Sequence, residues 1–221
     1  ARANGGTAMM DAAHQKRFNV KYLAWIDSGV GFNIFTVNEP KFRSSDGVLD
    51  MSGVKMRDNP IYTAFLKSVE ATTSPMPSTE VYGALEKGVI DAAPWTTIGI
   101  TDLKWNKFLN YMVEPSFYST DLGIIVNLDR WNGLSAEAKA ILQDVAIEWE
   151  QKSHNDRKAD ISKYKAAYKE GGMDFVSHSD SGGANYLKLA YDSVWARATE
   201  RMTDKGDGGD VAKLRALYAP E

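Results

Sequence analysis

The sequence predicts an α/β fold, because short apolar runs typical of strands alternate with helically spaced stretches between Ser52 and Thr97. The expected strands are Gly53–Arg57, Thr72–Pro75 and Val89–Ala93. Strands joined by helices need right-handed crossovers, which favour a mainly parallel sheet. Ligands of such sheets bind at the carboxyl ends of the strands, so a binding site is expected at that edge.

Two helices are expected between these strands and a third after them. The first begins at Pro60, because a proline in the first turn of a helix leaves no N–H group unpaired. The second has Ser78 as its N-cap and ends before Gly88, where a left-handed residue is favoured. The third is expected at Ile98–Asn106.

The rest of the chain predicts further strands and one unusually long helix. A helix is expected within Ala1–Arg17, and the other elements are strands at Val20–Ile26, Ile34–Val37, Asp121–Val126 and Met173–Ser177, a turn at Asn127–Leu134 and a helix at Ala184–Met202. The long helix starts at an N-cap, Ser135, continues to about Glu170, and would span roughly 50 Å. It carries an apolar stripe formed by Ala138, Ile141, Leu142, Val145 and Trp149. The alternative is two helices, broken near Ser153–Asp156.

Composition excludes several classes of function. The 221 residues include 26 Lys plus Arg and 29 Asp plus Glu, a formal charge of -3 that gives no sign of a nucleic-acid partner. There is no cysteine, so disulfides, thiolate nucleophiles and cysteine-based metal sites are excluded. The three histidines lack zinc-ligand spacing, and no phosphate-binding loop is present.

Two glycines, Gly29 and Gly31, follow the expected strand Val20–Ile26. A dinucleotide-binding fingerprint would need a third glycine and a following helix, and both are missing. Glycine also permits unusual backbone angles, so a hinge is the preferred interpretation.

The run Gly-Val-Lys-Met-Arg at 53–57, followed by Pro-Met-Pro-Ser-Thr-Glu-Val-Tyr-Gly-Ala-Leu-Glu-Lys-Gly-Val-Ile-Asp at 75–91, resembles the solute-binding proteins of TRAP transporters, the DctP type. The resemblance implies a two-lobe periplasmic solute-binding protein fold, type II-like, with hinge strands and a long helix linking the lobes. It implies a protein that captures a small organic acid between two lobes in the periplasm and delivers it to TRAP membrane permease subunits. It begins in the middle of a family member, so the first lobe is expected to be incomplete.

The same resemblance implies a division of the chain. The expected parts are 1–30 in the first lobe, 31–94 in the second lobe, 95–118 returning to the first lobe, 119–134 as a second-lobe strand, 135–170 as the lobe-spanning helix, and 171–221 as a C-terminal strand and helices.

Arg57 is the principal candidate for ligand binding. The resemblance identifies it with the arginine that clamps the ligand carboxylate, and a guanidinium fork suits carboxylate in a way that lysine does not. The alternative from sequence chemistry is a structural ion pair with Asp91 or Glu80.

Six further residues are candidates for the wall of the site: Trp95, Asn33, Phe32, Phe117, Tyr118 and Asp121. Many family members carry Arg where this chain has Asn33, which makes dicarboxylates and sialate less expected ligands. Trp95 is similar to the 2-keto-acid branch, which also uses a neighbouring Glu and a bound cation. Pro94 occupies that Glu position, so neither a metal nor a cofactor is expected.

Two other classes of function remain as alternatives. An α/β enzyme could use Arg57 to orient an organic acid, but the sequence shows no base or nucleophile suited to accompany it. The other alternative is a structural or interaction module without a ligand.

Overall fold

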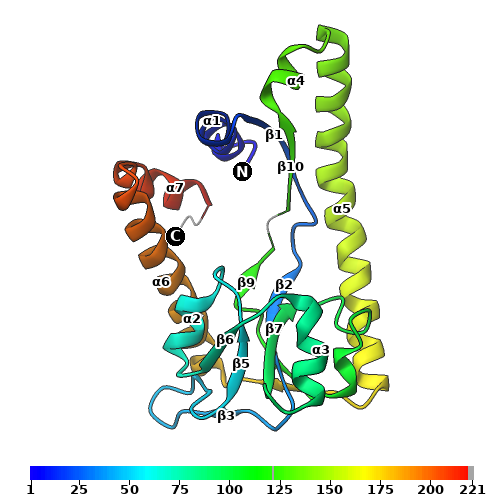
Figure 1. The fold of residues 1–221 in the computed structure, drawn as a ribbon, viewed down its shortest axis with the longest axis vertical. Helices are drawn as coiled ribbons and strands as arrows, with labels where there is room; N and C mark the ends of the chain where they lie inside the picture. Colours follow the sequence, from blue (N-terminus) through cyan, green and yellow to red (C-terminus); the bar gives the residue numbers. More distant parts are fainter. Residues whose placement is uncertain (121, 219–221) are drawn as a thin grey trace. The chain divides into compact units, whose positions relative to one another are not determined.

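The computed structural model (Figure 1) describes residues 1–120 and 122–218. The chain forms two units, each assembled from separate segments. Unit 1 comprises Ala1–Gly29, 121–158 and 198–221, and unit 2 comprises Val30–Thr120 and Ala159–Arg197. The first passage from one unit to the other falls between Gly29 and Val30, at the glycine pair where a hinge is expected.

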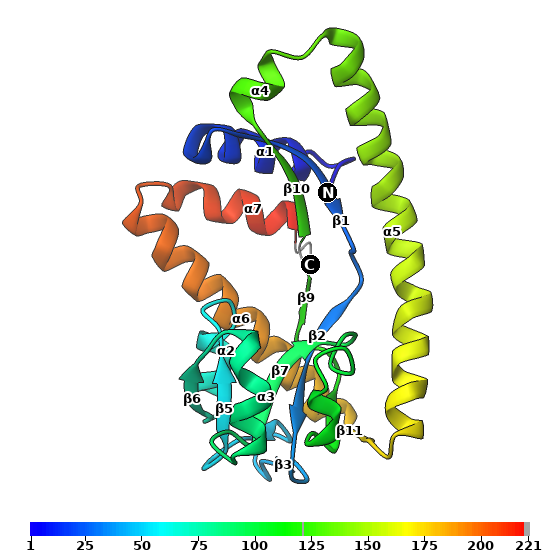
Figure 2. The same cartoon turned by 45° about the vertical axis from the view of Figure 1, so that its right-hand side comes forward.

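Unit 2 is built on a mixed sheet of seven strands among the described residues, in the order β11-β8-β2-β7-β5-β6 with β9 also paired to β2 (Figure 2). Their bounds are β2 Gly31–Thr36, β5 Lys55–Asp58, β6 Thr72–Pro75, β7 Ala92–Thr96, β8 Tyr111–Glu114, β9 Tyr118–Ser119 and β11 Asp174–Ser177. A small separate pair consists of β3 Lys41–Phe42 and β4 Leu49–Asp50.

The predicted parallel arrangement is correct for part of this sheet. β5 is parallel to both β6 and β7, and β8 is parallel to β11. β2, however, is antiparallel to β7, β8 and β9. The sheet is therefore mixed, because β2 enters it from outside the strand–helix–strand repeat.

The two helices of the repeat are α2, Thr63–Ser68, and α3, Ser78–Glu86. Pro60 precedes α2 by a turn instead of lying in its first helical turn. The N-cap of α3 is Pro77, so Ser78 is the first helical residue and the predicted side-chain cap is wrong. Gly88 has φ +64°, which confirms the left-handed position expected after α3.

The helix expected at Ile98–Asn106 is absent. The segment forms turns and a short 3₁₀ helix, η1, at Trp105–Lys107. Gly99 and Lys104 both have positive φ, +98° and +59°, and such a residue interrupts a right-handed helix.

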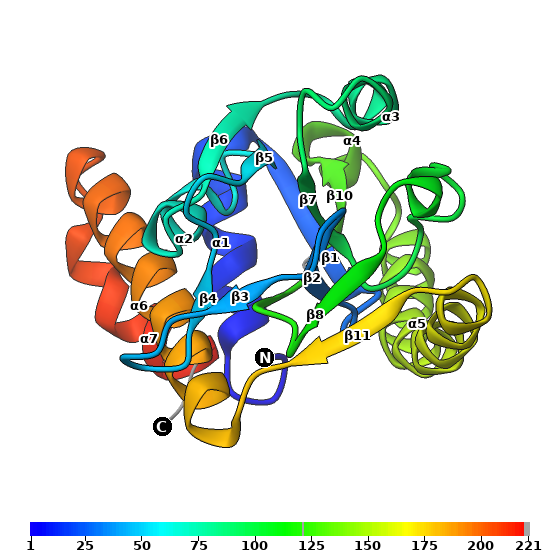
Figure 3. The same cartoon turned by 90° about the horizontal axis from the view of Figure 1, so that it is seen from below.

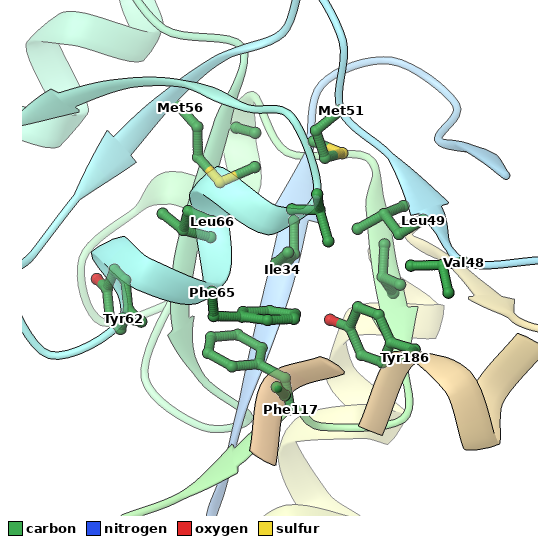
Figure 4. Packing of buried hydrophobic residues seen from close by; sticks show 14 residues of the cluster. Ile34, Val48, Leu49, Met51, Met56, Tyr62, Phe65, Leu66, Phe117 and Tyr186 are labelled. Atoms are coloured by element: carbon green, nitrogen blue, oxygen red, sulfur yellow. The ribbon is translucent and has the colours of Figure 1, made fainter. Parts of the chain in front are cut away.

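The core of unit 2 lies on both faces of the sheet. Successive strand residues point to opposite faces, so Ile34 belongs to one buried cluster and Phe35 to the other. The first cluster packs against α2 and against α6, Asp180–Asp204, while the second packs against α3 and α5, Ala136–Glu170 (Figure 3). Figure 4 shows the first cluster, in which the rings of Phe65 and Phe117 stack with centroids 4.7 Å apart.

Unit 1 has a smaller core. Its described elements are α1 Gly6–Phe18, β1 Val20–Ile26, β10 Leu122–Asn127, α4 Leu128–Asn132, η2 Gly208–Asp210, α7 Val211–Tyr218 and parts of α5 and α6. β1 pairs with β10 and with no other described strand. The buried members of the core are Leu23, Ala24 and Ala146. Residues 127–134, predicted as a turn, contain α4, whose N-cap Asn127 accepts a hydrogen bond from the backbone N–H of Arg130.

The long helix α5 is continuous over 35 residues, which confirms its prediction and excludes a break near Ser153–Asp156. Ser135 caps it by accepting a hydrogen bond from the backbone N–H of Ala138 at 3.1 Å. The predicted apolar stripe is present but not buried: Ile141 and Val145 are each 56% exposed, and Trp149 is 43% exposed.

Two parts of the expected division differ from the structure. Residues 95–118, expected to return to the first lobe, lie in unit 2, because β8 pairs with β2 inside the same sheet. β10 lies in unit 1 instead of the second lobe, because its partner is β1.

Candidate functional site

The candidate residues meet at one edge of the unit 2 sheet. Arg57 is near the carboxyl end of β5, and Trp95 is near the carboxyl end of the parallel strand β7. β2 runs the other way, so its first residues reach the same edge: Phe32 pairs with Thr96 and Asn33 with Trp95. Phe32 also pairs with Tyr118 of β9, so the described candidates are neighbours in space.

Arg57 is buried, with 4% of its surface exposed. Its Nε donates a hydrogen bond to the carbonyl oxygen of Met76 at 3.3 Å. Its Nη1 donates to the hydroxyl of Tyr62 and, at 3.5 Å, to the carbonyl oxygen of Pro94. Its Cζ atom lies 5.4 Å from the centre of the Trp95 ring and 5.7 Å from that of Tyr62, within the range of cation–π attraction.

Tyr62 is the residue that links the guanidinium to the strand end. The residue is 1% exposed, and its hydroxyl lies 3.4 Å from the Pro94 carbonyl oxygen, to which it donates. Burial raises the pKa of Tyr62, and the positive charge of Arg57 only partly offsets this effect. The hydroxyl is therefore protonated at neutral pH, accepting from Arg57 and donating to Pro94.

No described carboxylate forms an ion pair with Arg57. In particular, neither Asp91 nor Glu80 does so, which removes the structural alternative named for this residue. Nη2 makes no hydrogen bond to a described residue. A buried cation is stabilised by a paired anion, so an anion that reaches Nη2 would be favoured.

Asn33 is buried, at 1% exposed, and its amide is engaged by the protein. Its Nδ2 donates to the carbonyl oxygen of Val113 at 2.9 Å. Its Oδ1 accepts from the hydroxyls of Thr97 at 2.7 Å and Ser116 at 2.9 Å. These bonds join β2 to β8 and to the segments that follow β7 and β8, and one Nδ2 hydrogen remains for another acceptor.

The three aromatic candidates other than Trp95 differ in exposure. Phe117 is 3% exposed and belongs to the buried cluster of Figure 4, whereas Phe32 and Tyr118 are partly buried. The rings of Phe32, Tyr62 and Phe117 contact one another, and the Phe32 centroid lies 5.9 Å from that of Tyr62 and 6.2 Å from that of Phe117. Burial raises the pKa of Tyr118 to about 12, so its hydroxyl is also neutral at physiological pH.

The remaining expectations concern Asp121, metal ions and membrane spans. Asp121 lies outside the described residues. Within the described part, no group of three His, Cys, Asp or Glu side chains is arranged to hold a metal ion. None of the described helices combines the length and the apolar character needed to cross a bilayer.

Sequence reasoning missed Tyr62 and the two carbonyl groups that hold Arg57. The signal for Tyr62 is its position five residues after Arg57, at the turn where the strand passes into the next helix. The carbonyls of Met76 and Pro94 carry no signal, because any residue supplies a backbone oxygen.

The sequence profile of the DctP family, described as bacterial extracellular solute-binding protein family 7, matches residues 3–200. The monocarboxylate 2-oxoacid-binding periplasmic protein all3028 of Nostoc sp. is 31% identical over 106 residues, covering 46% of this chain and 29% of that protein. The C4-dicarboxylate-binding periplasmic protein DctP of Rhodobacter capsulatus is 26% identical over 199 residues, covering 89% of this chain and 57% of that protein.

A crystal structure of a TRAP periplasmic solute-binding protein from Desulfovibrio salexigens, with bound orotic acid, shows the same fold. Its TM-score is 0.79 at 19% identity, over 99% of this chain and 69% of that one. The two-lobe α/β class expected from the sequence is thus confirmed. The matches to the two curated relatives span less than two thirds of those proteins' lengths.

Proposed function

Since the chain belongs to the DctP family, bacterial extracellular solute-binding protein family 7, we propose that it binds a small organic carboxylate at Arg57. The family consists of solute-binding receptors and is not an enzyme family, so the enzyme alternative does not hold. The observation that carries the proposal is the buried guanidinium of Arg57, which faces no described carboxylate and keeps Nη2 without a partner.

The geometry supports an anion with a carboxylate group. Nη2 supplies the first charge-assisted hydrogen bond to a carboxylate oxygen. A second bond comes from Nη1 or Nε, whose present contacts with the Pro94 and Met76 carbonyls are long, at 3.5 and 3.3 Å. We propose that the wall of the site consists of Trp95, Phe32, Tyr118, Phe117 and Asn33, with Asp121 as a further contact.

Location and partners follow from the family as part of the same proposal. Proteins of the DctP family are extracytoplasmic binding proteins, and the related structures are those of TRAP solute-binding proteins. We therefore propose that this protein works in the periplasm and delivers its carboxylate to the permease subunits of a TRAP transporter.

The proposal is tested by calorimetric titration of the protein at its full natural length with pyruvate, succinate and orotate. These acids represent the ligand classes of the three relatives described above. Arg57→Ala should weaken binding by roughly 30-fold to several thousand-fold, since removing one partner of a buried charge pair costs about 2–5 kcal/mol. Arg57→Lys should recover only part of the loss, because it keeps the charge without the planar fork.

The matched control is Lys55→Ala, which removes an exposed positive charge from the same strand. It should leave the affinity unchanged, and pyruvamide, the neutral amide of pyruvate, should not bind. Equal affinity of Arg57→Ala and the unaltered protein would remove the carboxylate assignment. A loss of binding that coincides with unfolding in a thermal melt would return Arg57 to a structural role.

A further inference from the structure

The orientation of Arg57 is fixed by its neighbours before any ligand arrives. An arginine side chain has several rotatable bonds, and ordering them on binding would cost free energy. Here the Arg57 guanidinium lies beside two aromatic rings, those of Trp95 and Tyr62, and donates to three oxygens. Two of the three oxygens are backbone carbonyls, which no side-chain substitution removes.

We infer that Tyr62 is a positioning residue of the carboxylate site: its hydroxyl holds Nη1 of Arg57 and thereby leaves Nη2 as the nitrogen presented to the ligand. This inference rests on the proposed function. It adds a residue that does not itself touch the carboxylate and that the sequence does not single out.

Tyr62 is suited to this role because its hydroxyl can accept one hydrogen bond and donate another. A neutral hydroxyl accepts from the guanidinium while donating to Pro94, so neither hydrogen-bonding capacity is left unused. An acidic side chain in its place would neutralise Arg57 and compete with the ligand, whereas the uncharged hydroxyl does not neutralise the guanidinium.

The Tyr62 ring is itself held in place. It belongs to the buried cluster of Figure 4, where it contacts Phe117 edge-on at 6.0 Å, and the figure shows it at the margin of that cluster. The backbone beside it is also fixed, because Nη1 of Arg197 in α6 donates to the carbonyl oxygen of Ile61 at 3.2 Å. The hydroxyl therefore occupies a defined position relative to the end of β5.

The decisive variant is Tyr62→Phe, which keeps the ring and removes only the hydroxyl. We expect binding of pyruvate, succinate or orotate, whichever acid the unaltered protein binds, to weaken about 10-fold, because a hydrogen bond to a charged group is lost. The matched control is Tyr186→Phe. Tyr186 is a fully buried tyrosine of the same cluster whose hydroxyl has no described hydrogen-bond partner, so its loss should not change affinity.

A double-mutant cycle separates positioning from a general structural effect. In the Arg57→Lys background, Tyr62→Phe should change the affinity less than about 3-fold, because the interaction it removes is already gone. An undiminished 10-fold effect in that background would show that Tyr62 does not act through Arg57, and would overturn the inference.

A measurement without ligand completes the test. Rotation of the Arg57 guanidinium, followed by nitrogen-15 NMR of its Nη groups, should be slow in the unaltered protein and faster in Tyr62→Phe. If Tyr62→Phe changes neither the rotation nor the affinity while Arg57→Ala still loses binding, the inference is rejected. The proposed function then still holds. If Arg57→Ala binds normally, the proposed function fails and the inference fails with it.

Discussion

At the scale of single residues, the site consists of a charged group and a neutral frame. Arg57 supplies a buried guanidinium at this strand edge, and the hydroxyl and carbonyl groups to which it donates carry no net charge. Removal of the Arg57 charge should therefore weaken ligand binding. Removal of a neutral group of the frame should also lower the free energy of unfolding.

Asn33 belongs to the frame, and Asn33→Ala should lower the free energy of unfolding by about 2–4 kcal/mol. The substitution removes the partner that Asn33 provides to the Val113 carbonyl and the Ser116 hydroxyl, while the Thr97 hydroxyl keeps the Gly31 carbonyl oxygen at 3.1 Å. Buried groups that lose a hydrogen bond cost about 1–3 kcal/mol each. Urea denaturation monitored by circular dichroism measures this change.

The control for Asn33 is Asn110→Ala. Asn110 also donates to a backbone carbonyl, that of Val37 at 2.8 Å, but it is exposed, so water replaces the lost partner and the change should stay within about 1 kcal/mol. Equal losses for the two variants would show that the buried network around Asn33 is not stabilising.

At the scale of elements, α5 holds the end of β1 through a polar face. Glu150 accepts from the backbone N–H of Trp25 at 3.0 Å, and Ser153 accepts from that of Asp27 at 3.0 Å. His154 lies one residue further along, with Nδ1 2.9 Å from the Ser28 carbonyl oxygen. Residues three and four apart share one face of a helix, so these groups act together just before the chain leaves unit 1.

Ser153→Ala should therefore lower the free energy of unfolding by about 1 kcal/mol, since it removes the hydrogen bond between the Asp27 N–H and the hydroxyl of Ser153, a residue that is 2% exposed. Ser193→Ala is the control, because the Ser193 hydroxyl donates to Leu189 of its own helix at 2.7 Å and its loss should cost less than about 0.5 kcal/mol. Differential scanning calorimetry compares the two. A smaller loss for Ser153→Ala than for its control would contradict the role given to this face.

The sequence predicted the elements better where the signal was local. Thr72–Pro75 and the long helix were placed within a residue of their bounds, because prolines stop the former and a helical cap starts the latter. The helix predicted at Ile98–Asn106 is wrong, because the helical spacing of apolar residues does not reveal the positive φ of Lys104. The antiparallel direction of β2 depends on pairing across the sheet, which no local pattern specifies.

The same distinction applies to the site. Arg57 was identified because it belongs to a recurrent pattern, and its position at a strand end was predictable from the alternation of strands and helices. Tyr62 depends on how one turn folds back on β5, and the network of Asn33 depends on partners 64 to 83 residues away. Contacts of that range are set by the whole sheet.

At the scale of the molecule, two partly buried carboxylates make the stability of unit 1 depend on pH. Burial acts to raise the pKa of Asp11 and of Glu150, yet hydrogen bonds outweigh it and lower both pKa values. Lys21 and the Tyr22 N–H act on Asp11, and Arg2 acts on Glu150. Both carboxylates lie in unit 1.

Acid should therefore destabilise unit 1. A lowered folded pKa gives stability that is fully present above the unfolded pKa, about 4 for these groups, and is lost as the pH falls through the folded pKa. We expect the melting temperature to decrease as the pH drops below about 4. The decrease should be less steep in the double variant Asp11→Asn and Glu150→Gln. Glu137→Gln, which removes an exposed carboxylate from α5, is the control. An identical pH profile for the double variant and the unaltered protein would refute this assignment.

The assembly of each unit from distant segments also affects the protein while it is being made. β1 ends at Ile26, and its described partner β10 begins at Leu122, so a ribosome adding about 5–20 residues per second needs roughly 5–20 s to supply that partner. Throughout this interval β10, the described partner of β1, is not yet available to pair with it. The nascent chain thus carries β1 without this partner, a state that a chaperone could recognise, well before the residues that form the carboxylate site have all been synthesised.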